Sequence, residues 1–270
     1  MRKRRAAGIA AMVSTFYAVG CSLLVDTEGL GGSPTPDASG DATGDRTAQA
    51  ESGADTSAPI DAGKTCEATF CDDFDEGGIG ARWTSKDIQN GGLLDLGTPA
   101  VSAPNALRTR FATSTAMTDR VALLERDLGM GTHLRCDFSM FLETRPSTSF
   151  VDLFRIRTTA PGVNEYNLFF GVNASTGATF REDLYLTDGG CGCPRKEANP
   201  PTLLASRWVR VSVETDFATA SLAYDGVVVS AGNFGGFTPG SNIFVALGTV
   251  AYQQQPSVVL FDDFSCTLGP

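Results

Sequence analysis

The sequence of residues 65–270 predicts an all-β domain, a sandwich or barrel of about eleven short strands. Runs of alternating apolar and polar residues, rich in β-branched and aromatic side chains, recur at short intervals and are separated by Gly, Pro, Asn or Asp. Nowhere does an apolar period of 3.6 residues persist over three turns, so no long helix is expected. The sequence has no fixed internal repeat, which argues against a propeller or a solenoid.

Residues 1–20 have the layout of a secretory signal peptide. A basic start, Arg2 to Arg5, precedes a weakly apolar run that contains no acidic residue and is shorter than the ~20 residues of a membrane-spanning helix. Residues 18–21, Ala-Val-Gly-Cys, resemble a bacterial lipobox, with Ala18 where leucine is usual. The resemblance implies that Cys21 is acylated and becomes the mature N-terminus. The alternatives are an ordinary signal peptide and a short membrane anchor.

Residues 21–64 form the lipidated cysteine and a linker. The segment is rich in Ala, Gly, Asp, Ser, Thr and Pro and has no aromatic residue, so it is expected to stay disordered as a tether. The opening Cys-Ser-Leu-Leu-Val-Asp and the linker resemble lipoproteins of myxobacteria and their relatives. In such lipoproteins Ser22, rather than Asp, after the cysteine implies sorting to the outer membrane. We therefore expect an exported protein that is held to the cell envelope by its lipid.

The folded domain is expected over residues 65–270, which is enough for one sizeable core. Each expected strand has a period of two or is rich in β-branched and aromatic residues. The expected strands span residues 69–74, 105–111, 120–128, 133–143, 150–158, 166–172, 179–187, 208–215, 218–224, 242–250 and 258–267.

Two pairs of segments carry a family resemblance. Residues 206–213, Ser-Arg-Trp-Val-Arg-Val-Ser-Val, and residues 223–228, Ala-Tyr-Asp-Gly-Val-Val, resemble the tryptophan strand and the Asp-Gly hairpin of concanavalin A-like and laminin-G-like jelly rolls. Residues 70–75 and 261–266 each carry an Asp-Asp-Phe sequence, and the resemblance places these first and last strands side by side. It implies a concanavalin A-like jelly-roll sandwich of two antiparallel sheets.

The cysteine count fits an oxidising compartment. Lipidation of Cys21 leaves an even set of six, for which 15 connectivities exist. The six are Cys66, Cys71, Cys136, Cys191, Cys193 and Cys266. The jelly-roll resemblance implies the pair Cys136–Cys266, which leaves Cys66–Cys71 and Cys191–Cys193 as local bridges. The alternatives are bridges from the 191–193 loop to the N-terminal pair and a zinc site at Cys191 and Cys193, for which further ligands at metal spacing are missing.

Enzymes of this fold carry motifs that the sequence lacks. Jelly-roll glucanases place carboxylates on one strand as Glu-x-Asp-x-Glu, whereas Glu214-Thr215-Asp216 has no second Glu after it. The single histidine, His133, stands in neither a Gln-x-His strand nor a nucleophile elbow, and is expected to be an ordinary strand-end residue. We therefore expect a carbohydrate- or surface-binding module. The alternatives are a glycan-active hydrolase or lyase with an unrecognised site and a structural envelope lipoprotein.

Strand alternation assigns side chains to faces. The residues expected in the core are Phe154, Ile156, Tyr166, Leu168, Phe170, Leu184, Leu186, Val209, Val211 and Val213. The residues expected on the opposite faces are Arg155, Arg157, Asn167, Phe169, Asn173, Arg181, Asp183, Tyr185 and Arg210. Of these, Arg155, Arg157, Asn167, Phe169, Arg181 and Tyr185 are the candidate ligand-binding residues, with Arg155, Arg181 and Tyr185 expected on one exposed face. The alternative is a solvated face whose charges pair across strands.

Paired aspartates raise the question of a metal. Asp72, Asp73, Asp262 and Asp263 would approach one another if the terminal strands are neighbours, and Ca²⁺ takes six to eight oxygen ligands. A structural Ca²⁺ is the resulting hypothesis; the alternative is aspartates that face solvent beside core phenylalanines. The net charge of −10 argues against nucleic acid as a partner and leaves the lipid anchor and a polysaccharide as the expected contacts.

Overall fold

The computed structural model describes residues 66–113, 118–145, 150–160, 162–174, 177–186, 196–234, 237–251 and 256–270. Within these ranges the chain forms fifteen β-strands and no helix. None of the described residues therefore belongs to a helix long and apolar enough to cross a membrane. The strands are β1 (Phe70–Asp72), β2 (Ser85–Gln89), β3 (Gly92–Gly97), β4 (Ala106–Phe111), β5 (Arg120–Gly129), β6 (His133–Thr144), β7 (Phe150–Ala160), β8 (Val163–Asn173), β9 (Gly177–Leu186), β10 (Lys196–Ala198), β11 (Trp208–Thr215), β12 (Thr219–Tyr224), β13 (Val227–Asn233), β14 (Ile243–Ala251) and β15 (Ser257–Gly269).

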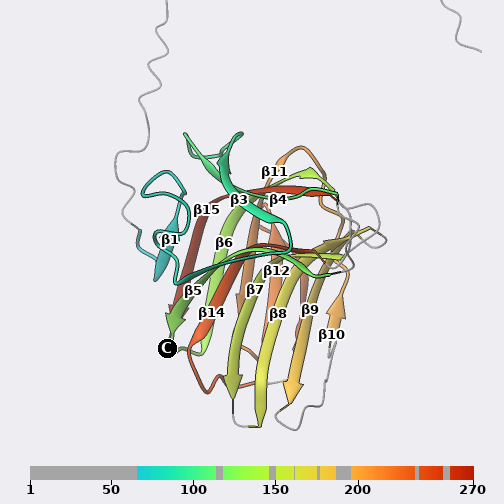
Figure 1. Ribbon diagram of the computed structural model, residues 1–270. Helices are drawn as coiled ribbons and strands as arrows, with labels where there is room; N and C mark the ends of the chain where they lie inside the picture. Colours follow the sequence, from blue (N-terminus) through green and yellow to red (C-terminus); the bar gives the residue numbers. More distant parts are fainter. Residues whose placement is uncertain are drawn as a thin grey trace, which may run out of the picture. The chain divides into compact units, whose positions relative to one another are not determined.

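The strands form two antiparallel sheets that pack against each other as a sandwich (Figure 1). The eight-stranded sheet has the order β13-β12-β11-β6-β15-β4-β3, and β1 also pairs with β15. The seven-stranded sheet has the order β10-β9-β8-β7-β14-β5-β2. Side chains of both sheets meet in one core, where the ring centroids of Phe138 on β6 and Phe154 on β7 lie 5.3 Å apart. The predicted all-β sandwich is confirmed.

The first and last strands lie side by side, as the jelly-roll resemblance implies. Strand β1 pairs with β15 so that Phe70 lies opposite Cys266 and Asp72 opposite Phe264. The rings of Phe70 and Phe264 each lie 5.1 Å from the indole of Trp83. This aromatic cluster fixes β1 to the centre of the sheet, because β15 is itself flanked by β6 and β4.

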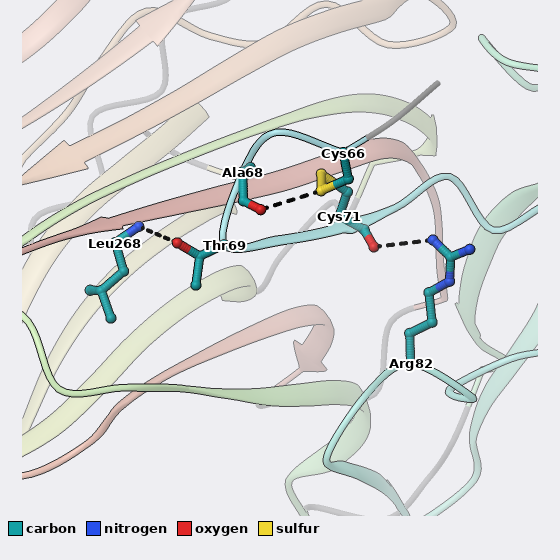
Figure 2. Close-up of a disulfide and its surroundings, with 6 residues drawn as sticks. All are labelled: Cys66, Ala68, Thr69, Cys71, Arg82 and Leu268. Carbon is teal, nitrogen blue, oxygen red and sulfur yellow. Dashed lines mark hydrogen bonds between the residues drawn. A yellow bond between two sulfur atoms is a disulfide. The ribbon is translucent and has the colours of Figure 1, made fainter. Parts of the chain in front are cut away.

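Two disulfides lie within the described residues. Cys136 on β6 and Cys266 on β15 are direct cross-strand partners and are bonded to each other. Cys66 is bonded to Cys71 and closes a short loop at the start of β1, which Figure 2 shows beside the hydrogen bond from the Leu268 amide to Thr69. These are two of the three expected pairs; Cys191 and Cys193 lie outside the described residues.

The tryptophan strand and its hairpin form where the sequence places them. Trp208 opens β11, and Asp225 and Gly226 join β12 to β13. Both turn residues have positive φ, 49° and 79°, which is the geometry for which Asp-Gly is favoured in two-residue hairpins. The Asp225 carboxylate also accepts a hydrogen bond from the Arg210 amide at 2.9 Å and so ties the turn to β11.

Burial follows the predicted alternation for the core positions. Nine of the ten residues expected in the core are buried; Leu186, the last residue of β9, is 36% exposed. Three residues expected on the opposite faces are also buried: Asn167, Phe169 and Asp183. Arg210 lies on β11, in a different sheet from the other residues expected on those faces, because a period of two does not show which sheet a strand joins.

Four strands were not expected: β2, β3, β10 and β13. All five residues of β2 are exposed, so its sequence carries no alternation between buried and solvent-facing positions. Strand β10 has only three residues, and β13 is an edge strand whose first two residues are exposed. Edge strands lack the apolar face on which sequence patterns depend.

Candidate functional site

The outer face of the seven-stranded sheet carries a row of side chains from five adjacent strands. Arg181 on β9 lies opposite Phe169 on β8, which lies opposite Arg155 on β7. The row continues through Ala246 on β14 to Glu125 on β5. We call this outer face, defined by Arg155, Arg157 and Arg181, the arginine face.

A second row runs beside the first. Asp183 lies opposite Asn167, Asn167 opposite Arg157, and Arg157 opposite Phe244. The Arg157 guanidinium carbon lies 4.8 Å from the centroid of the Phe244 ring. In the first row, the Arg181 guanidinium carbon lies 4.6 Å from the Phe169 centroid. Stacking on aromatic rings holds these planar cations flat against the sheet.

Every arginine of this face also has a carboxylate partner. Arg157 Nη2 donates to both carboxylate oxygens of Glu125, at 2.9 and 3.1 Å, and Arg155 Nη2 lies 3.7 Å from the same carboxylate. Arg181 lies 3.2 Å from Asp183 and 3.5 Å from Asp152. The charges of the arginine face are therefore compensated within the sheet.

Several polar groups of this outer face are buried. Asn167 is 1% exposed and Asp183 is 6% exposed. Asn167 Oδ1, Asp183 Oδ1 and the Nε atoms of Arg155 and Arg157 are buried and have no hydrogen-bond partner among the described residues. An unsatisfied buried polar group costs about 1–3 kcal/mol, so groups of this kind are retained where they serve a purpose.

A pocket of about 240 Å³ opens on the same face. Its apolar part includes Val121, Leu123 and Val250, members of a small cluster that is separate from the main core. Its polar lining includes Arg155, Gln89 and three aspartates, Asp87, Asp119 and Asp152. The pocket therefore combines an apolar patch with hydrogen-bonding groups, as ligand sites do.

The pocket forms where two neighbouring strands lose their regular register. Strand β7 has an irregularity between Asp152 and Phe154, and β14 has one between Leu247 and Val250. Gly248 lies in the second irregularity with φ 139°, and a Cβ atom there would be 2.2 Å from the Ala122 carbonyl oxygen. Bulges re-aim side chains and are frequent beside functional sites. Here they turn Asp152 and Leu153 toward the pocket.

The structure places all six candidate ligand-binding residues on the arginine face. Arg155, Arg181 and Tyr185 share it, but only Tyr185 is clearly exposed, at 38%, whereas the Arg181 side chain is 16% exposed. Burial raises the pKa of the Tyr185 phenol, and the carboxylates of Asp183 and Glu165 add to the effect. The phenol is therefore a protonated hydrogen-bond donor at neutral pH.

Four acidic residues of this face were not predicted from the sequence, whereas Asp183 was. Glu125 and Asp152 pair with its arginines, and Asp87 and Asp119 line its pocket. Glu125 follows a run that is buried on both faces, and Asp87 lies on the fully exposed β2. Strand alternation applied to β5 places Glu125 on the same face of the sheet as Leu123, because the two residues are two positions apart.

The four aspartates proposed for Ca²⁺ do not form a metal site. Among the described residues, no group of three or more Asp, Glu, His or Cys side chains could hold a metal ion. Asp72 accepts hydrogen bonds from the Trp83 indole at 2.7 Å and the Phe74 amide at 3.0 Å. Asp262 accepts from the amides of Val101 and Ser102 at 2.7 and 2.9 Å. Each of these two carboxylates holds a different loop, so the carboxylates are not available to share a cation.

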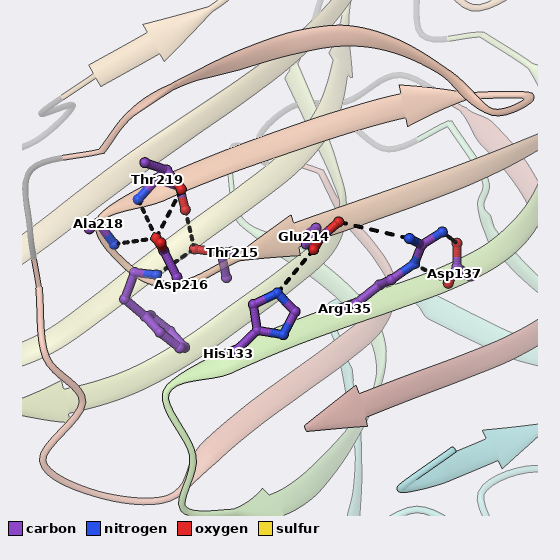
Figure 3. Close-up of polar contacts among 9 residues, drawn as sticks. His133, Arg135, Asp137, Glu214, Thr215, Asp216, Ala218 and Thr219 are labelled. Carbon is purple, nitrogen blue, oxygen red and sulfur yellow. Dashed lines mark hydrogen bonds and ion pairs between the residues drawn. The ribbon is translucent and has the colours of Figure 1, made fainter. Parts of the chain in front are cut away.

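The outer face of the eight-stranded sheet carries a different polar group, which we call the histidine face and define by His133, Arg135 and Glu214 (Figure 3). His133 Nε2 lies 3.0 Å from Glu214 Oε1, and Arg135 lies 3.8 Å from the other oxygen of Glu214. The side chains are 42–52% exposed. His133 was expected to be an ordinary strand-end residue, and its pairing with Glu214 requires the β6–β11 contact, which a local pattern does not reveal.

Asp216 does not belong to this group. Its carboxylate accepts hydrogen bonds from the amides of Ala218 and Thr219, at 2.9 and 2.6 Å, and from the Thr219 hydroxyl (Figure 3). These hydrogen bonds, led by those from Thr219, lower the pKa of Asp216. The residue shapes the turn between β11 and β12, so the Glu214-Thr215-Asp216 sequence is not a pair of catalytic carboxylates.

Solved structures share the sandwich. An endo-β-1,4-glucuronan lyase from the fungus Trichoderma reesei superposes with a TM-score of 0.60 at 14% identity, covering 76% of this chain and 96% of the lyase. The domain has a concanavalin A-like jelly-roll fold. The cellulose induced protein Cip1 superposes with a TM-score of 0.54 at 16% identity, over 74% of this chain and 99% of Cip1. No protein-family model matches the sequence, and no curated protein matches it either.

Proposed function

We propose that this protein binds a carbohydrate without cleaving it and that the arginine face is the binding surface. The observation that carries the proposal is the pocket of this face, which combines an apolar patch with the polar side chains of Arg155, Gln89 and three aspartates. Sugars present hydroxyl groups that both donate and accept, together with apolar C–H faces. Such a ligand matches both the polar side chains and the apolar patch of the pocket.

The structural relatives support a glycan as the ligand class. One of the two described above is a lyase of a β-1,4-linked polysaccharide, and the other is a protein induced by cellulose. Fold similarity by itself carries no activity, so any glycan binding by this chain depends on the residues of the arginine face.

The residues of the arginine face favour binding over a histidine-dependent reaction. The chain has a single histidine, His133, which lies on β6 in the other sheet. The phenol of Tyr185 has a raised pKa and is a poor base at neutral pH. Because carboxylates alone can cleave glycosidic bonds, the turnover assays below are part of the test.

A glycan array with the purified full-length chain tests the proposal, with reducing-end and unsaturated-product assays on every hit. We expect binding without turnover, weakened at least tenfold by Arg155→Ala. The matched control is Arg135→Ala on the histidine face, which should bind as the wild type does. Absence of binding to every neutral and acidic polysaccharide would leave a structural envelope role instead.

The second candidate is a glycan-active enzyme that uses the histidine face. The pair of His133 and Glu214 borders an open cavity of about 580 Å³, and an imidazole beside a carboxylate is a common acid–base arrangement. Turnover in the assays above, abolished by His133→Gln and unaffected by Arg155→Ala, would establish this candidate in place of the first.

We also propose that the protein is a lipoprotein, exported and anchored through Cys21, with the domain held away from the outer membrane by its linker. This part depends on the sequence of residues 1–64, which lie outside the described residues. Multiple acyl chains would give a stable attachment. Radiolabelled palmitate should enter the wild type and not Cys21→Ala; equal labelling of both would contradict the anchor.

A further inference from the structure

The pocket of the arginine face is lined by more carboxylates than cations. Asp87, Asp119 and Asp152 line it together with a single arginine, Arg155. That arginine lies 3.7 Å from the Glu125 carboxylate, so its charge is already shared. Asp152 is likewise paired, with Arg181, so a ligand carboxylate placed in the pocket would meet the charges of Asp87 and Asp119 in addition to two compensated groups.

The other two arginines do not change this balance. Arg157 donates to both oxygens of Glu125, and Arg181 pairs with Asp152 and Asp183. Both guanidinium groups are also stacked on aromatic rings, and turning one toward a ligand anion would break a charge-assisted hydrogen bond. Among the described residues, the arginine face therefore offers no cation that is free to hold an anionic sugar.

The polar side chains that line the pocket point to the same ligand chemistry. The oxygens of Asp87, Asp119 and Asp152 are acceptors, whereas the amide group of Gln89 both donates and accepts. A hydroxyl group can serve either kind of atom. An ionised carboxylate only accepts, so it can take no hydrogen bond from the three aspartates.

The size of the pocket limits how much of a chain it can hold. Its volume of about 240 Å³ is below the ~300–1,000 Å³ of sites that enclose a drug-sized ligand. The pocket is therefore suited to one sugar ring, whose C–H face can lie on the apolar patch formed by Val121, Leu123 and Val250. The rest of a polysaccharide would lie along the rows of the arginine face.

From these observations we infer that the ligand of the arginine face is an uncharged glycan and not a polyuronate. This inference rests on the proposed carbohydrate-binding function. It separates the protein from the glucuronan lyase that shares its fold, because that enzyme acts on an acidic polysaccharide.

Matched pairs of hexasaccharides test the inference by calorimetry with the full-length chain. The pairs are β-1,4-glucan with β-1,4-glucuronan, β-1,4-mannan with β-1,4-mannuronan, and α-1,4-galactan with α-1,4-galacturonan, each differing mainly in the group at C6. In any pair that binds, we expect the uronate to bind at least tenfold more weakly than its neutral partner in low salt. The difference in affinity should become smaller in high salt, because salt screens the repulsion between the carboxylates.

Charge-reversal variants provide the control. Asp87→Lys and Asp119→Lys change exposed side chains at the pocket, and each should raise the ratio of uronate affinity to neutral-hexamer affinity several-fold. Glu143→Lys makes the same charge change at an exposed position of the other sheet and should alter neither the uronate affinity nor the neutral-hexamer affinity. A uronate or a cationic chitosan hexamer that binds the wild type more tightly than every neutral hexamer overturns the inference while carbohydrate binding stands. If no hexamer of any charge binds, the proposed function itself fails.

Discussion

The two outer faces of the sandwich both carry charged side chains, but they differ in how deeply the charges lie. On the arginine face, Arg181 is packed on aromatic rings with its side chain 16% exposed, and Asp152 beside it is 3% exposed. On the histidine face, the side chains of Arg135 and Glu214 are 52% and 42% exposed. Exposed ion pairs contribute about 0–1 kcal/mol, whereas buried polar groups are costly unless they are hydrogen-bonded or paired. Depth of burial, more than the presence of charge, therefore separates a candidate site from an ordinary surface.

The largest effect is expected where the arginine face depends on a glycine. In Gly248→Ala the new Cβ would lie 2.2 Å from the Ala122 carbonyl oxygen and 3.0 Å from Leu123 Cα, at a backbone φ of 139°. We expect a loss of about 3 kcal/mol or more in the free energy of unfolding, because neither backbone atom can move without breaking the β5–β14 pairing. Gly232→Ala is the control in the other sheet, since its nearest neighbour would be 3.8 Å away. Denaturant unfolding of both variants measures the two losses in free energy. Similar losses would contradict a specific requirement for glycine at position 248.

The next effect concerns pH and the eight-stranded sheet. Asp262 is fully buried on the outer side of that sheet under residues 98–104, and burial raises its pKa to about 6 from the ordinary 3.8. The folded state therefore favours the protonated acid, so this stabilisation is complete below pH 3.8 and is lost as the pH rises through 6. Between pH 4 and 7, the unfolding free energy of the wild type relative to Asp262→Asn should fall by about 2–3 kcal/mol.

Carbon-13 NMR of the Asp262 carboxyl gives an independent measurement of this titration. The Asp95 carboxyl is the reference, because its hydrogen bond with Arg108, opposed in part by burial, lowers its pKa. The contribution of Asp95 to the free energy of unfolding has the opposite pH dependence: it is present above the ordinary pKa of an aspartate and is lost as the pH falls. An Asp262 midpoint near that of Asp95 would contradict the expected burial of this carboxylate.

The smallest effect is the loss in unfolding free energy when one carboxylate is removed from each face. Glu125→Gln leaves Arg155 and Arg157 without their shared partner in a partly buried setting, and should cost about 1–2 kcal/mol of unfolding free energy. Glu214→Gln removes an exposed partner of His133 and Arg135, and should cost less than about 0.5 kcal/mol. Equal losses in thermal or denaturant unfolding would remove the distinction drawn between the faces.

The sequence was sufficient to predict the sandwich and the two rows of the arginine face, because both follow from strand alternation with a period of two. Alternation placed Phe154 and Phe170 inward and Arg155 and Phe169 outward, as the register shows. The Asp-Gly turn at 225–226 was predictable for a similar reason, since its backbone geometry selects particular residues.

The pocket and the carboxylate partners could not be predicted in this way. The pocket depends on register shifts around Leu153 and Gly248, and alternation assumes that no such shift occurs. The Ca²⁺ hypothesis failed because Asp72 turns toward the indole of Trp83, a residue outside any strand. The pair of His133 and Glu214 joins strands that are far apart in the sequence, so no local pattern contains it.

The central place of β15 has a consequence for biogenesis. Strands β1, β4 and β6 each pair along one edge with Ser257–Gly269, which is synthesised long after them. Contacts between such distant segments form slowly, because the intervening chain must first be brought together. The nascent polypeptide therefore emerges from the ribosome with these edges unpaired and cannot close its larger sheet until this last strand arrives. Until then the backbone groups of β1 that pair with β15 have no partner within the sheet.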